Sequence, residues 1–167
     1  TKLFANTAVR EALSLAIDRD AIAEAVVFAK AATALVPYKV FNGDSYKKDF
    51  RTVGGSLIST SADMAAAKAK LSEANIDASK YSFSILVAAY DDVHVAIAEM
   101  VAAAWNELGF KVKLEKVDVK VNDDRGTTDE IPTDIKDDIC LERVRVGDYE
   151  VAAVDLVSYS TDAFSIL

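Results

Sequence analysis

The feature that most constrains the fold is the run from Tyr81 to Val117, where a strand, a helix and a second strand follow directly on one another. Residues 81–87 alternate aromatic or aliphatic side chains with serine, which is typical of a strand that becomes buried on both faces. Residues 92–108 carry apolar side chains at helical spacing, and Gly109 stands where a helix ends. Residues 110–117 then alternate again. Two strands joined through a helix predict a parallel pair with a right-handed crossover.

The central helix is expected to have its N-cap at Asp92. Its apolar stripe consists of Val93, Ile97, Val101, Ala104 and Leu108. In the strand that follows, the alternation changes parity after Leu114, so the sequence predicts a bulge or a strand end near Glu115 and Lys116.

The C-terminal part continues the alternating order of elements. Residues 122–130 read as a solvated loop, and a helix is predicted from about Thr133 to Val146, with Gly147 as its stop. A last, mostly apolar strand is predicted over residues 149–157. The order strand, helix, strand, helix, strand predicts an α/β fold: a single lobe with a small parallel sheet flanked by helices.

The N-terminal part is predicted to be helical. Residues 6–27 read as two short helices broken near Asp18, which is expected to cap the second of them. An alanine-rich helix is predicted to begin at the capping-box pair Thr60 and Asp63 and to stop near Asn75. Between these helices, residues 38–59 show only turn signals, at residues 42–44 and at Gly54 and Gly55.

Composition and charge exclude several classes of function. A chain of 167 residues is about one domain. Its net charge of -8 argues against binding to nucleic acid or to anionic lipid, since both need a basic surface. The single cysteine excludes an internal disulfide. Because the chain starts at Thr1 and ends at Leu167 within an apolar pattern, we expect it to be a piece of a longer exported protein, so that the lack of a targeting segment says nothing about location.

Several motifs carry a family resemblance. Residues 9–22, V-R-E-A-L-S-L-A-I-D-R-D-A-I, resemble the opening of the second-lobe segment in bacterial extracellular solute-binding proteins of family 5, the oligopeptide- and dipeptide-binding components of ABC importers. Further stretches resemble that family in consistent order: residues 31–37, 61–74, 81–87, 93–110, 111–115 and 141–154. The resemblance is weak over residues 41–60 and 119–138, and the second of these regions looks like an insertion or loop.

The resemblance implies a function in binding, without catalysis, cofactor or metal. Residues 1–167 would form one periplasmic-binding-protein-like lobe, a fragment of a two-lobe receptor that closes over an extended peptide-like ligand. The full-length protein would hand this ligand to the membrane permease of an ABC importer. It would act outside the cytoplasm, in the periplasm or lipid-anchored at the cell surface.

Ligands of open parallel sheets bind beyond the carboxyl ends of the strands. The loops there are expected to contain Tyr90 and Asp91 after one strand, and Ser158, Tyr159 and Asp162 after the last strand. Many family members hold the ligand's amino terminus with an aspartate that aligns with Ser158, while Tyr159 matches the family and Asp162 lies four residues on. This departure from the family pattern puts a ligand with a free amine in doubt and leaves an extended, backbone-bound ligand possible.

Two other classes of function remain as alternatives. A receiver-like α/β signalling domain with an acidic pocket at Asp91 and Asp92 is disfavoured because no lysine follows the last strand. A small hydrolase is disfavoured because the only histidine, His94, has no nucleophile placed beside it by the sequence pattern. Cys140 lies among apolar positions and is expected to be a core residue.

Overall fold

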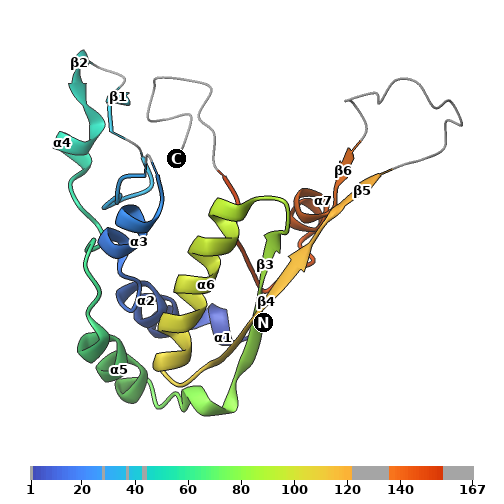
Figure 1. The fold of residues 1–167 in the computed structure, drawn as a ribbon. Coiled ribbons are helices and arrows are strands. Elements are labelled where there is room, and N and C mark those ends of the chain that lie inside the picture. Colours follow the sequence, from blue (N-terminus) through green and yellow to red (C-terminus); the bar gives the residue numbers. More distant parts are fainter. Residues whose placement is uncertain (1, 28, 37, 43–44, 122–135, 156–167) are drawn as a thin grey trace, which may run out of the picture. The chain divides into compact units, whose positions relative to one another are not determined.

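The computed structural model of the chain describes residues 2–27, 29–36, 38–42, 45–121 and 136–155 (Figure 1). Within this part of the chain there are two compact units. One contains residues 77–154, and the other contains residues 2–76 together with Asp155. The prediction that all 167 residues belong to one lobe stays a prediction.

The unit of residues 77–154 is built on a parallel sheet. Its strands are β3 (Ser82–Ala88), β4 (Lys111–Val117) and β7 (Val151–Ala152), in the order β4-β3-β7. Strands β3 and β4 stay in one register from the pair Ser82 and Lys111 to the pair Ala88 and Val117. Strand β7 pairs with β3 in the same direction. The prediction of a small parallel sheet flanked by helices is therefore confirmed.

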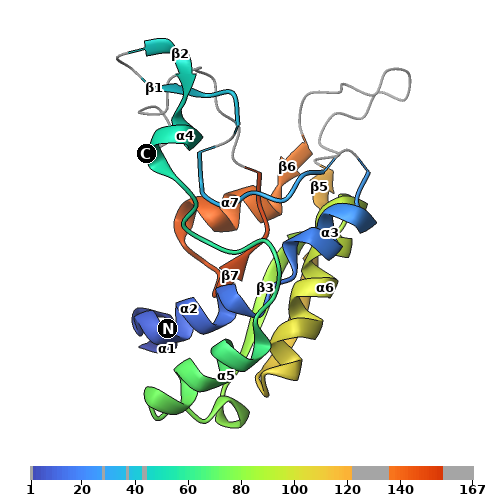
Figure 2. The same cartoon turned by 90° about the vertical axis from the view of Figure 1, so that its left-hand side faces the viewer.

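The two helices of this unit lie on opposite faces of the sheet (Figures 1 and 2). Helix α6 (Asp92–Glu107) covers the face that carries Phe83, whose ring centroid lies 5.8 Å from that of Trp105. Helix α7 (Ile139–Val146) covers the other face, where Cys140 packs with Leu86 and Ala88. Because successive side chains of a strand point to opposite faces, β3 supplies both cores. The expectation that Cys140 is a core residue is confirmed.

Helix α6 has the predicted length but differs from the prediction in two details. Its N-cap is Asp91 rather than Asp92. The buried residues within the helix are Ala98, Ala102 and Trp105, next to the predicted stripe. Of the stripe itself, Leu108 is buried at the C-cap and Val93 is 50% exposed. The buried face of α6 is thus formed by small alanine side chains and by Trp105, whose ring packs against Phe83 of β3.

The structure decides between the two predictions made for the end of β4. The register between β3 and β4 is unbroken through Glu115 and Lys116, so the bulge is wrong, whereas the predicted strand end is confirmed to within one residue, at Val117. A short antiparallel pair follows, formed by β5 (Val119–Val121) and β6 (Lys136–Asp138). Because residues 136–138 are a strand, the prediction of a helix over them is wrong, and α7 begins at Ile139.

The remaining features of this unit are short. A 3-10 turn, Ala78–Lys80, precedes β3. Gly147 ends α7 with φ at 75°, which confirms its predicted role as the stop, since that backbone conformation favours glycine. Residues 122–135 contain most of the predicted loop and lie outside the described residues, so an insertion over residues 119–138 stays a prediction.

The unit of residues 2–76 begins with three helices, α1 (Lys2–Ala5), α2 (Thr7–Leu15) and α3 (Arg19–Ala25). The predicted break near Asp18 is confirmed, because the Asp18 carboxylate accepts a hydrogen bond from the Ala21 backbone N–H at 2.9 Å and caps α3. Arg19 fixes the joint, since its guanidinium donates to the carbonyl oxygens of Ser14, Ile17 and Ser59.

The second half of this unit contains one predicted helix and one hairpin that sequence patterns did not indicate. Helix α5 (Met64–Glu73) is capped by Asp63 alone, and Asn75 adopts a φ of 55° at its end, as predicted. The Thr60 carbonyl instead accepts from the backbone N–H groups of Arg19 and Asp20, so the predicted capping box is wrong. Strands β1 (Phe41–Asn42) and β2 (Ser45–Asp49) form an antiparallel pair that leads into α4 (Phe50–Gly54).

Candidate functional site

The loop that links β3 to α6 lies at the carboxyl edge of the parallel sheet. Strand β3 ends at Ala88, and the backbone N–H of Ala89 donates to the Val117 carbonyl at 2.7 Å. The chain then turns so that Tyr90 is 53% exposed at this edge. Its hydroxyl donates to Oδ2 of Asp138 at 2.6 Å. The loop after β3 is thereby joined to the start of α7, which follows β6 directly.

Asp138 has two roles in this link. Its Oδ1 atom accepts from the Leu141 backbone N–H at 3.0 Å and caps α7, while its Oδ2 atom accepts from Tyr90. Burial opposes ionisation of this carboxyl, but the hydrogen bonds from Tyr90 and from the backbone outweigh it and hold the pKa of Asp138 below its ordinary value. The same hydrogen bond, with burial and the negative charge of Asp138, raises the pKa of Tyr90 to about 12.

Asp91 lies beside Tyr90 but is turned towards its own helix. Its Oδ1 atom accepts from the His94 backbone N–H at 2.9 Å, and its Oδ2 atom lies 2.7 Å from Nδ1 of His94. The His94 backbone bond is the main reason that the pKa of Asp91 lies below its ordinary value. Helix capping therefore occupies both oxygens, and a role of Asp91 in holding a ligand stays a prediction.

The other predicted site residues lie outside the part of the chain that the structure describes. They are Ser158, Tyr159 and Asp162. Their assignment to the ligand-binding edge stays a prediction. Strand β7, which leads towards them, pairs with the centre of β3 and runs parallel to it, so its carboxyl end points to the same edge as Ala88.

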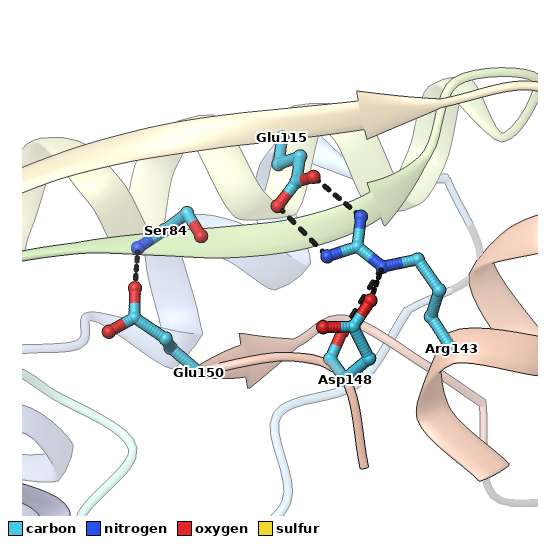
Figure 3. A network of polar contacts seen from close by, with 5 residues as sticks. All are labelled: Ser84, Glu115, Arg143, Asp148 and Glu150. Atoms are coloured by element: carbon cyan, nitrogen blue, oxygen red, sulfur yellow. Dashed lines mark hydrogen bonds and ion pairs between the residues drawn. The ribbon is translucent and has the colours of Figure 1, made fainter. Parts of the chain in front are cut away.

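A second polar cluster was not predicted from the sequence (Figure 3). Arg143 of α7 forms two hydrogen bonds with Glu115 of β4, at 2.5 and 3.3 Å, and a third bond at 2.9 Å with Asp148. Beside it, the Glu150 carboxylate accepts from the Ser84 backbone N–H at 2.9 Å, just before β7 begins to pair with β3. The cluster fixes α7 and the start of β7 to the sheet.

This cluster explains why the alternation in β4 changes parity. Glu115 lies opposite Leu86 in the register and so points to the face covered by α7, where Arg143 meets it. Lys116 points to the other face, where its Nζ atom lies 2.9 Å from Oε1 of Glu99 in α6. Two neighbouring charged residues thus each pair with a helix on opposite faces. The sequence signal was the change of parity after Leu114, from which a bulge or a strand end was predicted.

The electrostatics of the cluster favour its charged form. The hydrogen bonds from Arg143 hold the pKa of Glu115 below its ordinary value, against the effect of burial. The same bonds to Glu115 raise the pKa of Arg143. Both groups are partly exposed, so solvent screens the pair and its main effect is on orientation.

Among the described residues, no three histidine, cysteine or acidic side chains are gathered in a way that would hold a metal ion. Within the same residues, no helix combines the length and the apolar character needed to cross a bilayer.

Comparisons with known proteins agree with this architecture. A family model described as bacterial extracellular solute-binding proteins, family 5, middle part, matches residues 1–164. No curated protein matches the chain at a significant level.

Solved structures show the same fold. A structure titled as the peptide-binding protein of a peptide ABC transporter has a TM-score of 0.73 and 23% identity, over 98% of this chain and 65% of its own. The pheromone receptor PrgZ has a TM-score of 0.75 and 22% identity, over 99% of this chain and 30% of its own. Peptide-bound OppA from Listeria monocytogenes has a TM-score of 0.56 and 24% identity, over 68% of this chain and 23% of its own.

At these identities the structures establish the fold alone. The chain spans less than two thirds of the length of each of these three proteins. The family model, in contrast, covers nearly the whole chain and agrees with the order of elements around the parallel sheet. This chain therefore belongs to family 5 of the bacterial extracellular solute-binding proteins.

Proposed function

We propose that this chain supplies part of the ligand-binding cleft of a peptide receptor that serves an ABC importer. The observation that carries the proposal is the family match over residues 1–164. The three similar structures add support, since they are a peptide-binding protein of a peptide ABC transporter, a pheromone receptor that binds peptide, and a peptide-bound OppA. The receptor would act outside the cytoplasm, bind without catalysis and pass its ligand to a membrane permease.

We propose that the ligand lies at the sheet edge that contains Tyr90. Tyr90 is exposed there, and its hydroxyl is held by Asp138, so the aromatic ring has a fixed position beside the carboxyl ends of β3 and β4. A fixed aromatic ring offers contact area at a small cost in conformational entropy. We assign Tyr159, Asp162 and Ser158 to the same edge, and an extended peptide as the ligand.

The proposal is tested first by comparing this chain with its full-length parent. A receptor that encloses its ligand from two sides removes it from water on both, and losing about 5 kcal/mol of contacts weakens a micromolar ligand by more than about three orders of magnitude. Titration calorimetry with short unmodified peptides is expected to show saturable binding by the parent and none by this chain at millimolar concentration. A parent that binds none of the peptides would refute the proposal.

The position of the site is tested by a matched pair of tyrosine variants in the parent. Tyr90 follows the carboxyl end of β3, and Tyr81 precedes its amino end, with 53% and 36% of their surfaces exposed. Tyr90→Ala is expected to weaken peptide binding about tenfold, as are Tyr159→Ala and Asp162→Ala, whereas Tyr81→Ala leaves the affinity unchanged. Equal effects of Tyr90→Ala and Tyr81→Ala would show that the cleft lies elsewhere.

A further inference from the structure

A second polar site lies in the unit of residues 2–76, around Arg51 of α4. Arg51 is the charged residue that the described part of the chain buries, with 9% of its surface exposed. Its Nη2 atom donates to the Thr33 hydroxyl, and the Ser56 hydroxyl donates to the same Thr33 oxygen at 3.0 Å. A guanidinium and two hydroxyl groups from distant parts of the sequence are thus brought together. None of these residues belongs to the sheet edge around Tyr90.

The cluster has a hydrogen-bond donor left over. The Nη1 atom of Arg51 is buried and has no hydrogen-bond partner among the described residues. The Thr33 oxygen accepts two bonds, and the Thr33 hydroxyl also hydrogen-bonds to the Tyr38 oxygen. Buried donors of a charged group are costly to leave unpaired, so the cluster favours an acceptor that carries negative charge.

The nearest carboxylate does not supply that charge. The two oxygens of Asp49 accept from the backbone N–H groups of Lys39 and Arg51, at 2.8 and 2.9 Å, and these bonds hold the pKa of Asp49 below its ordinary value. Asp49 therefore caps α4, and the guanidinium affects it through its charge without an ion pair between the two side chains. Within the described ranges, no ion pair joins Arg51 or Lys30 to an acidic side chain.

Two positively charged side chains lie against the Tyr38 ring beside this cluster. The Cζ atom of Arg51 lies 4.9 Å from the centre of the Tyr38 ring, and Nζ of Lys30 lies 4.4 Å from it. A side-chain hydrogen bond with Arg51, another with Thr33 and the positive charges of Arg51 and Lys30 hold the pKa of Tyr38 below its ordinary value, against the effect of burial. Two cations thus share one ring, and this ring is 42% exposed.

We propose that Arg51, Thr33 and Tyr38 form a subsite for a carboxylate group of a small solute. The carboxylate would accept from Nη1 of Arg51 and from the Thr33 hydroxyl when the Tyr38 ring swings outward, and Lys30 would add favourable charge. The two oxygens of a carboxylate match these two donors, whereas a phosphate would bring further charged oxygens for which the subsite has no donor. The subsite does not depend on peptide binding at the sheet edge.

The test is a titration of the isotope-labelled chain with sodium acetate, followed by heteronuclear NMR against sodium chloride at equal ionic strength. Acetate is expected to produce saturable shifts of the Arg51 Nε–H and of the Thr33 and Ser56 amides. Arg51→Gln should weaken acetate binding about tenfold or more, since a charged hydrogen-bond donor is lost. Arg10→Gln is the matched control, because Arg10 is an exposed arginine of the same unit that donates to the Phe4 and Ala5 carbonyls. It should leave binding unchanged.

A second variant and a second anion complete the experiment. If Arg51→Gln does not fold, Thr33→Val removes one donor and is expected to weaken acetate binding about fivefold. Inorganic phosphate is titrated in parallel and is expected to bind more weakly than acetate. Acetate shifts that do not saturate, equal binding by Arg51→Gln and Arg10→Gln, or a preference for phosphate would each overturn the proposal. Because acetate binding and peptide binding are measured separately, the subsite and the proposed function fail independently.

Discussion

At the scale of single residues, the site is shaped by which polar atoms are already paired. The loop after β3 contains an exposed aromatic ring and a carboxylate, and both look equally available in the sequence. In the structure Asp91 is engaged by its own helix, whereas the Tyr90 ring is exposed and only its hydroxyl is bound. Which of two neighbouring side chains is free to meet a ligand is thus decided by capping, a local interaction.

The capping role of Asp91 is measurable. Asp91→Ala is expected to lower the free energy of unfolding by about 1 kcal/mol, the usual loss for an N-cap. Asp92→Ala is the control, since Asp92 lies in the first turn and is expected to cost only a few tenths of a kcal/mol. Urea unfolding of both variants gives the comparison. Because the pKa of Asp91 is lowered in the folded state, its contribution is present above about pH 4 and is lost as the pH falls. Equal costs for both variants would contradict the capping role.

Tyr90 offers a direct readout of its bond to Asp138. Spectrophotometric titration is expected to place its pKa near 12, with Tyr90→Phe identifying its signal among the six tyrosines. Asp138→Asn should bring this pKa down towards 10, the ordinary tyrosine value. Since the folded-state pKa lies above the unfolded value, the bond contributes fully to stability below about pH 10 and the contribution is lost between about pH 10 and 12. A Tyr90 pKa near 10 in the wild type would show that the hydroxyl is not bound.

At the scale of helices and strands, the sequence predicted the elements better than their faces. Alternation and helical spacing identified β3, α6 and β4 and their parallel pairing, because burial imposes those periods on the sequence. The periods did not reveal that alanines form the contact face of α6 or that paired charges at Glu115 and Lys116 replace a bulge. Such features depend on partners far away in the sequence.

The short strands were not predicted, for the same reason. Helix α7 was predicted to begin before residue 136, but residues 136–138 pair with β5. A strand of three residues has no periodicity that can be read, and its partner fixes it. The antiparallel pair of β1 and β2 was not predicted either, because both strands are short. In the candidate site, Tyr90 was predicted, whereas its partner Asp138 was not, because 48 positions separate them in the sequence.

The corrected face of α6 leads to a prediction. Ala102→Asp is expected to cost more than about 3 kcal/mol, because it places an unpaired charge in the buried contact with the sheet. Ala103→Asp, one position along the same helix and exposed, is expected to cost only about 0.5 kcal/mol through lower helix propensity. Thermal unfolding followed by circular dichroism separates the two. Similar melting temperatures would mean that the contact face is assigned incorrectly.

At the scale of the whole molecule, the described residues form two compact units, and the lone cysteine belongs to only one of them. Cys140 is buried in the core between β3 and α7. Burial, reinforced by the charge of Asp138, raises the pKa of its thiol and so lowers its reactivity. Its accessibility therefore reports on the unit of residues 77–154 and not on the chain as an average.

Labelling of Cys140 with a thiol reagent is expected to be at least about 100-fold slower in the native chain than in urea, since reaction requires this unit to open. Ala102→Asp should bring the native rate close to the unfolded one, while Ala103→Asp preserves the protection. The labelling rate is read from the released chromophore at constant pH. Native labelling at the unfolded rate would show that the core around Cys140 is not closed.

The pairing of β5 with β6 has a practical consequence for this fold. The ladder from Val119 and Asp138 to Val121 and Lys136 holds the two ends of residues 122–135 side by side at the spacing of neighbouring strands. The paired residues lie between β4 and α7 and flank residues 122–135 on both sides. Residues 122–135 are therefore a natural place for an engineer to graft a reporter peptide or an epitope into the chain while keeping the parallel sheet intact.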